Sequence, residues 1–299
     1  MLDLLINAVL QASALGIGCI GASLTFRVLR YPDLTPDGSF MIGSAVFAAS
    51  VGSGMHWLLA VLCAVLGGVA AGILTGLISE WIKVTRLLAG ILSTMICYST
   101  AFRLLGGGPN RGIASTLLHG WNDTALGTFL IALAPIFLVS LLVQQLLRSE
   151  LGLLLRATGS NSALVAGFGR SPRLYTMIGL GIGNGLVALA AVVVSLQQQF
   201  VDLNFGVGIV ITFLCAVLLG EGIYGILPAS LRSKAGLRSL APVVGCAVYF
   251  SMYLLVLRAS LRDWLPFSIE PADLKLLSAV LLIALAASRQ GKGLRDIPI

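Results

Sequence analysis

Long runs without a charged residue are the feature that most constrains this chain. Of its 299 residues, 58% are hydrophobic and only 10% are charged. A soluble domain carries about 25% charged residues, and a membrane-spanning helix needs about 17 to 25 apolar residues. The sequence therefore predicts an integral membrane protein. The uncharged runs are Leu4–Phe26, Gly38–Ser79, Leu87–Phe102, Thr124–Leu147, Leu174–Val201, Leu203–Gly220, Ser239–Leu257 and Leu276–Ser288.

The run Gly38–Ser79 is too long for one crossing. As a helix, about forty residues measure about 60 Å, against a hydrocarbon core of about 30 Å. We expect the chain to double back near Val51–Trp57, between a short helix at Ser39–Ser50 and a full one at Leu58–Ile78. The fold class is then an all-α, polytopic transmembrane helical bundle of about 8 to 10 segments. The first run lacks a basic n-region, so we expect it to be retained as a helix.

The basic residues predict the orientation. When the loop Arg148–Arg173 is placed in the cytoplasm, fourteen of the nineteen Lys and Arg residues fall on that side. The positive-inside rule therefore explains the net charge of +7, and no nucleic-acid partner is needed. It predicts an external N-terminus and a cytoplasmic C-terminus.

Two short motifs suggest an internal repeat. "YPDLT", Tyr31–Thr35, and "FVDLN", Phe200–Asn204, each follow a long apolar run and lead into a glycine-containing apolar segment. On the predicted topology they lie on opposite sides, which is typical of inverted-topology transporter repeats. We expect a single transmembrane domain, 1–299, with pseudo-repeats at about 1–147 and 174–299.

A simpler alternative treats the first motif as a turn between helices. Pro32, Pro36 and Gly38 would break the helix, with Asp33 and Asp37 as turn or N-cap residues.

Polar residues around both motifs are candidates for a translocation pathway. A carboxylate at the centre of a spanning helix costs about 2.5 kcal/mol or more, so its presence there indicates a function. Glu221 ends an apolar run and is equally well interpreted as an interfacial residue. The candidates are Asp33, Thr35, Asp37, Asp202, Asn204 and Glu221.

Glycines at four-residue spacing predict close helix packing. Gly68, Gly72 and Gly76 would give one helix a face of small residues, and Gly179 and Gly183 have the same spacing in "GLGIGNG". Neither this segment nor "LGGGPNRG" has the spacing of a nucleotide-binding loop.

Catalytic and metal-binding patterns are not found in the sequence. His56 and His119 are expected in external turns, and the five cysteines are scattered singly as small apolar residues. We expect no catalytic residue, no metal site and no cofactor bound by this chain, which is not predicted to be an enzyme.

The segment 148–173 is basic and contains a Gly-Ser-Asn break before a short helix that ends near Gly169. The stretch "GLLLRATGSNSALVAGFGRSPRLY" resembles the coupling segment of permease subunits in ABC importers of the branched-chain amino acid and ribose type. "FRVLRYPDLTPDGSF" and "VDLNFGVGIVITFLCAVLLGEGIYG" are similar to a narrower branch assigned to tryptophan or tyrosine transport. The broader family has an Asn-Phe-Ala-His-Gly block where this chain has "YPDLTPDG", so substrate details of that family are not transferred.

The resemblance implies a permease in the bacterial inner membrane that pairs with a second copy, expected to be a homodimer. It implies docking on a cytoplasmic ABC ATPase dimer, which would hold ATP and Mg, and delivery of substrate by an extracytoplasmic binding protein. An amino acid is the favoured substrate, with aromatic or branched-chain ones preferred. The ATPase-coupling residues it implies are Arg156, Gly159, Ser160, Asn161, Leu164, Val165 and Gly169.

Two other classes of protein are left open. An ion-coupled secondary transporter would work without an ATPase and use Asp33, Asp202 and Glu221 for coupling. A membrane enzyme or scaffold is disfavoured, because the apolar spans contain no catalytic grouping.

Overall fold

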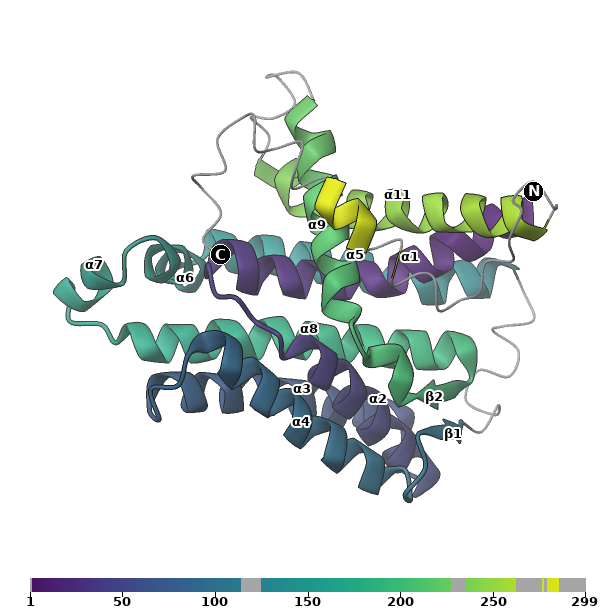
Figure 1. Cartoon of the computed structure of the whole chain (residues 1–299), viewed down its shortest axis with the longest axis horizontal. Helices are drawn as coiled ribbons and strands as arrows, with labels where there is room; N and C mark the ends of the chain where they lie inside the picture. The colour runs from purple at the N-terminus through teal and green to yellow at the C-terminus, as the bar shows by residue number, and fades with distance from the viewer. Residues whose placement is uncertain (1, 114–124, 227–234, 262–275, 277–278, 285–299) are drawn as a thin grey trace.

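The computed structural model describes residues 2–113, 125–226, 235–261, 276 and 279–284 (Figure 1). This part of the chain is almost entirely helical, which confirms the all-α expectation. One short antiparallel pair of strands, β1 with β2, is the exception. The elements are α1 Leu2–Ser23, η1 Leu24–Val28, α2 Pro36–Gly52, α3 Trp57–Glu80, α4 Arg86–Leu104, β1 Asn110–Gly112, α5 Ala125–Arg148, α6 Glu150–Ser160, α7 Ser162–Gly167, α8 Pro172–Gln198, β2 Phe200–Asp202, η3 Leu203–Gly206, α9 Ile209–Ile226 and α11 Ala235–Leu261.

Within the described residues, α3, α4 and α8 are long and apolar enough to cross a membrane. The pair α5 and α6 is bent by 73° and counts as a fourth candidate if it forms one span. The second apolar run doubles back as predicted, since α2 ends at Gly52 and α3 begins at Trp57. The last run, 276–288, lies mostly outside the described residues, and the total of 8 to 10 segments stays a prediction.

The first long helix is broken at the "YPDLTPDG" motif. After α1 the chain forms one π-helical turn, η1, and then Arg30 takes a left-handed backbone conformation with φ of 50°. Residues 29–35, which we call the break, run without regular structure to Pro36, the first residue of α2. Proline suits that position because it has no N–H to leave unpaired and its φ is already helical.

Helix α8 lies in the middle of the bundle, with α3 on one side and α1 on the other (Figure 1). Glycines allow both contacts. A Cβ at Gly72 would collide with the Leu180 carbonyl oxygen, and one at Gly68 would lie 2.6 Å from the Asn184 carbonyl oxygen. Gly76 faces Met177, so the three glycines of α3 form one row against α8.

The other face of α8 is equally close to α1. A Cβ at Gly183 would lie 2.5 Å from Thr25 Cγ2, and one at Gly21 would collide with the Gly183 carbonyl oxygen. Gly179 faces Leu29, the first residue of the break, at 3.0 Å. Without side chains, two helix backbones can approach closely and pack well in lipid.

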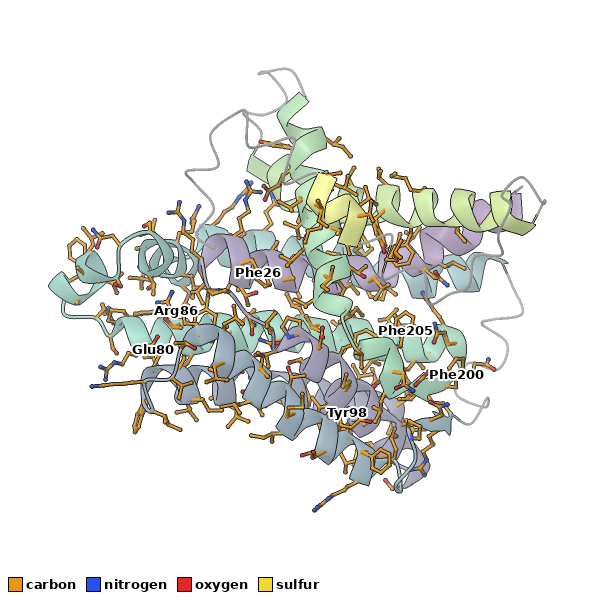
Figure 2. The ribbon with its side chains drawn as sticks, viewed as in Figure 1. Phe26, Glu80, Arg86, Tyr98, Phe200 and Phe205 are labelled. Carbon is orange, nitrogen blue, oxygen red and sulfur yellow. The ribbon has the colours of Figure 1, made fainter. Side chains whose placement is uncertain are left out.

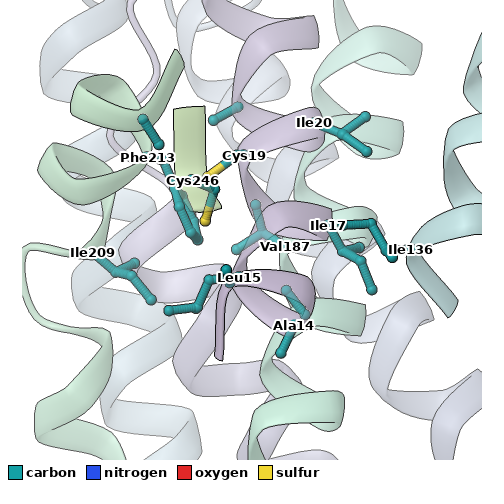
Figure 3. Close-up of a cluster of buried hydrophobic side chains, with 14 of the residues drawn as sticks. Ala14, Leu15, Ile17, Cys19, Ile20, Ile136, Val187, Ile209, Phe213 and Cys246 are labelled. Carbon is teal, nitrogen blue, oxygen red and sulfur yellow. The ribbon is translucent and has the colours of Figure 1, made fainter. Parts of the chain in front are cut away.

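The main apolar core surrounds α1 (Figure 3). Leu15, Ile17 and Cys19 of α1 pack with Val187 of α8 and with residues of α5, α9 and α11. Four of the five cysteines, all except Cys63, are buried, and all five are free thiols.

Helices of the two halves of the chain pack on each other; the halves are separated by residues 148–173, which we call the coupling segment. In the first half α3 packs on α8, the first helix of the second half, while α11 of the second half packs on α1. Helices α2 with α3 and α9 with α11 also pack in matching pairs. The pseudo-repeats and their inverted orientation stay predictions.

Candidate functional site: a buried polar network at a broken helix

Asp33 lies at the centre of the break and is completely buried. Its Oδ1 accepts a hydrogen bond from the Thr35 backbone N–H at 2.9 Å, and its Oδ2 accepts one from Asn184 Nδ2 at 2.8 Å. No described residue forms an ion pair with it. A buried carboxylate without a cation is stable only when such hydrogen bonds replace water.

Four further buried residues extend these bonds into what we call the Asp33 network. The Ser39 hydroxyl donates to Asn184 Oδ1 at 2.7 Å, and the Thr35 and Thr75 hydroxyls are 2.6 Å apart. Asn184 also donates to the Leu180 carbonyl at 3.0 Å. The network therefore fixes the break to α2, α3 and α8 at once.

Helix α4 holds the break from the remaining side. Thr94 donates its hydroxyl to the Leu34 carbonyl at 2.9 Å, and a Cβ at Gly90 would lie 2.8 Å from the Leu34 nitrogen. Asp33 and Thr35, both expected along a pathway, are thus sealed inside protein in this conformation. In this conformation neither side chain is accessible from outside the bundle.

Asp37 connects the two halves of the chain. Its Oδ2 accepts from the Gly208 N–H at 2.8 Å and its Oδ1 from the Val210 N–H at 2.9 Å. Asp37 lies in the first turn of α2, while Gly208 immediately precedes α9 and Val210 lies in its first turn. One carboxylate therefore serves the positive ends of two short helices, where an anion is most stabilising.

Glu221 is also used as a link between elements. It pairs with Arg27 of η1 at 2.6 Å, although no basic residue lies near it in sequence. Both side chains are partly buried. The pair connects α9 to the first half near the end opposite Asp37.

Asp202 and Asn204 repeat the local geometry of Asp33 and Thr35. Asp202 Oδ1 accepts the Asn204 N–H at 2.8 Å, the same two-residue turn that Asp33 makes with Thr35. In its corrected amide orientation, Asn110 of β1 also donates to Asp202 at 2.8 Å. The surroundings differ, since Asp202 is partly exposed and Asn204 is exposed. No described contact joins Asp33 with Asp202, so the structure does not bring the two motifs into one open route.

The coupling segment lies at one end of the bundle, where Figure 2 also places Glu80 and Arg86, while Phe200 and Phe205 are at the other end. Arg156 of α6 donates through Nη2 to the Leu147 carbonyl at 2.5 Å, at the sharp bend between α5 and α6. Asn161 caps α7 by accepting from the Ala163 and Leu164 N–H groups, beside the exposed Ser160. Gly169 ends that turn with φ of +70°, which L side chains rarely adopt.

The residues of α7 and its C-cap, Phe168, divide between an outer and an inner face. Leu164 and Phe168 are 50% and 73% exposed, whereas Val165 is fully buried. Val165 packs with Leu29 and Tyr31 of the break, among other residues. Val165 therefore anchors α7 to the bundle, and its expected part in ATPase coupling stays a prediction. Phe168, which the sequence interpretation left out, shares the outer face.

Gly159 brings the coupling segment against the chain just before the break. A Cβ at this position would collide with the Val28 carbonyl oxygen and lie 2.8 Å from the Leu29 carbonyl carbon. The end of α6 therefore rests directly on backbone that leads to Asp33. No side chain separates the two backbones at this contact.

Asn184, Ser39, Thr75 and Arg27 were missed from the sequence. Asn184 had a usable signal, because an amide in the middle of the apolar run Leu174–Val201 is costly unless it has a partner. Among the described residues, no group of three or more His, Cys, Asp or Glu side chains is placed to hold a metal ion.

Apolar helices broken at buried polar segments are characteristic of membrane transport proteins. The chain belongs to the family described as branched-chain amino acid transport system, permease component, whose sequence profile matches residues 4–285. It is accordingly a transport permease subunit.

Two relatives match nearly the whole chain. A tyrosine transport system permease protein of Clostridioides difficile (strain R20291) is 28% identical over 286 residues, covering 95% of this chain and 90% of the relative. An uncharacterized protein of Rickettsia prowazekii (strain Madrid E) is 30% identical over 293 residues, covering 97% and 99%. No solved structure matches the chain significantly.

Proposed function

We propose that this chain is the transmembrane permease subunit of an ATP-driven ABC importer in the bacterial inner membrane. The observation that carries the proposal is the two-sided construction of the coupling segment. Its outer face exposes Leu164 and Phe168, while Val165 and Gly159 connect its inner side to the break. A partner that moves the outer face would therefore act on the Asp33 network.

The energy source in this proposal is a separate subunit. The described residues contain no metal-binding group, and the chain has no phosphate-binding loop. A cytoplasmic ATPase dimer would hold ATP and Mg and dock on α7. A second permease copy would complete the membrane part, and an extracytoplasmic binding protein would deliver substrate.

The substrate we propose is an amino acid, with aromatic or branched-chain ones preferred. The name of the family and the name of the Clostridioides difficile relative both support this class. Binding of an amino-acid panel by the cognate external protein would test it directly. Saturable binding of sugars alone would contradict it.

The docking claim can be tested with the variant Leu164→Asp/Phe168→Asp. Both side chains are exposed, so the variant should fold, and it should lose co-purification of the ATPase because a charged face replaces an apolar one. Phe200→Asp is the control, an aromatic that is 44% exposed at the opposite end of the bundle. If the double variant retains the ATPase as the control does, α7 is not the docking element.

One observation favours a second candidate, an ion-coupled transporter. Asp33 is a fully buried carboxylate with no ion pair among the described residues, as a proton or cation site would require. Transport by the purified chain alone, in vesicles with an ion gradient and no ATPase, would establish this alternative.

A further inference from the structure

A polar cavity of about 600 Å³ opens at the end of the bundle that carries the coupling segment. It lies where α3 ends and where α4 and α8 begin, beside the α6–α7 turn. Figure 2 shows Glu80 and Arg86 at this end. Its lining includes Tyr31, Glu80, Arg86, Asn161, Arg173 and Thr176.

The charges around this cavity are arranged unfavourably unless an anion is present. Arg86 and Arg173 lie in the first turns of α4 and α8, where the helix dipole is positive and a cation is destabilised. Neither first turn contains an acidic residue, and neither N-cap side chain, Thr85 or Ser171, makes a capping hydrogen bond. Two long helices thus begin at one cavity, and each has an arginine in a first turn without a side-chain cap.

Glu80 balances only part of this charge. Among the described residues that line the cavity, Glu80 is the one with an acidic side chain. Its carboxylate is 4.0 Å from Arg173 Nε, which is the outer limit of an ion pair. The Arg86 guanidinium lies over the Tyr31 ring, 5.2 Å from the centroid. One positive charge therefore remains in excess.

Tyr31 supplies an independent sign of a missing partner. Its side chain is 1% exposed, it lines the cavity, and its hydroxyl has no hydrogen-bond partner among the described residues. The Ser79 hydroxyl donates to the Gly76 carbonyl oxygen at 3.2 Å, and it is not within hydrogen-bond geometry of this phenol. Buried hydroxyls are almost always paired, so this one has a donor to spare.

We infer that this cavity binds a phosphate group. Guanidinium groups pair bidentately with phosphate oxygens, and helix N-termini favour the same anion. The surroundings favour a phospholipid headgroup as the source. Trp81 and Ile82, next to Glu80, are 70% and 68% exposed, and tryptophan is enriched at the membrane interface. Leu87 and Leu88, next to Arg86, are exposed apolar side chains along which acyl chains can lie.

The test uses the intact chain in detergent and a series of charge variants. Native mass spectrometry would measure retained phosphatidylglycerol for the wild type, Arg86→Gln/Arg173→Gln and Glu80→Gln. Thermal unfolding with and without inorganic phosphate would show whether soluble phosphate binds and stabilises each protein. Arg103→Gln is the matched control, because Arg103 is an exposed arginine at the other end of α4.

We expect about tenfold weaker retention in Arg86→Gln/Arg173→Gln, stronger retention in Glu80→Gln, and no change in Arg103→Gln. Stabilisation by phosphate with unchanged lipid retention would also support the site and assign it to a soluble phosphate. Equal behaviour of all four proteins in both measurements would overturn the inference. So would variants that lose only ATPase co-purification, since the arginines would then contact a protein partner. The inference goes beyond the permease function. ATPase docking at Leu164 and Phe168 is tested separately by the Leu164→Asp/Phe168→Asp variant.

Discussion

Asn184 joins the middle of α8 to Asp33 in the break, with its Nδ2 2.8 Å from the carboxylate Oδ2. The same amide accepts the Ser39 hydroxyl through Oδ1 at 2.7 Å. One side chain therefore satisfies residues before and after Pro36, on both sides of the junction between the break and α2. Because donor and acceptor are both used and fully buried, the orientation of this amide is fixed by its neighbours.

Replacing Asn184 by leucine should destabilise the protein strongly. The change keeps the volume of the side chain but leaves the Asp33 carboxylate and the Ser39 hydroxyl without their partner. We expect a loss of about 3 kcal/mol in the free energy of unfolding, as for other buried charged groups that lose a hydrogen bond. Denaturant unfolding of the purified chain in detergent would measure it.

Ser195→Ala is the control for this variant. Ser195 is equally buried on the same helix, but it bonds only the Ala191 carbonyl of its own helix at 2.7 Å. Its removal should cost about 1 kcal/mol or less. Equal losses in the two variants would show that the Asp33 network adds no stability beyond an ordinary buried hydroxyl.

Gly72→Ala tests the closest contact between α3 and α8. The added Cβ would collide with the Leu180 carbonyl, which is backbone and cannot rotate away. We expect the helices to separate and the free energy of unfolding to fall by about 2 kcal/mol, a common effect of overpacking. Thermal unfolding followed by size-exclusion chromatography would measure the change.

Gly67→Ala provides the comparison on the same helix. Its Cβ would meet Val46 Cγ2 at 3.6 Å, an ordinary contact, and alanine favours helix by about 1 kcal/mol over glycine. This variant should match or exceed the wild type in stability. A Gly72 variant as stable as the Gly67 variant would refute the close approach of the two helices.

The helices were largely predictable because the backbone N–H and C=O groups of an uncharged run in lipid must bond to each other, and an α-helix satisfies them within one segment. The turn between α2 and α3 followed from length alone, since Gly38–Ser79 cannot cross once. The row Gly68, Gly72 and Gly76 was visible because a four-residue spacing places side chains on one helix face. These features are local and depend on composition and period.

The roles of the carboxylates were not predictable in the same way. Asp37 bonds Gly208, and Glu221 pairs with Arg27, so each partner comes from the other half of the chain. No spacing rule connects such positions. The burial of Val165 was not predictable for a related reason: on a helix of six residues, the sequence does not show which apolar side chain faces inward.

Gly159→Ala should separate coupling from docking. The new Cβ would collide with the Val28 carbonyl and displace the chain that leads to Asp33, while Leu164 and Phe168 stay exposed. We expect ATPase co-purification to persist and transport in reconstituted vesicles to fall by about tenfold, equivalent to about 1.4 kcal/mol. Gly167→Ala is the control, because a Cβ there meets nothing within 4 Å. Normal transport by both variants would exclude this contact from the coupling route.

Asp37→Ala and Asp37→Asn should form a graded pair. Alanine removes both bonds to the start of α9, whereas asparagine keeps one acceptor and presents an N–H to the other backbone donor. N-cap losses of this kind amount to about 1 to 2 kcal/mol, so we expect about 2 kcal/mol for alanine and a smaller loss for asparagine. Asp202→Ala is the comparison, because that carboxylate serves its own turn at the partly exposed start of η3. If Asp37→Ala lost no more unfolding free energy than Asp202→Ala, the bonds between Asp37 and the start of α9 would stabilise the protein no more than a local turn contact does.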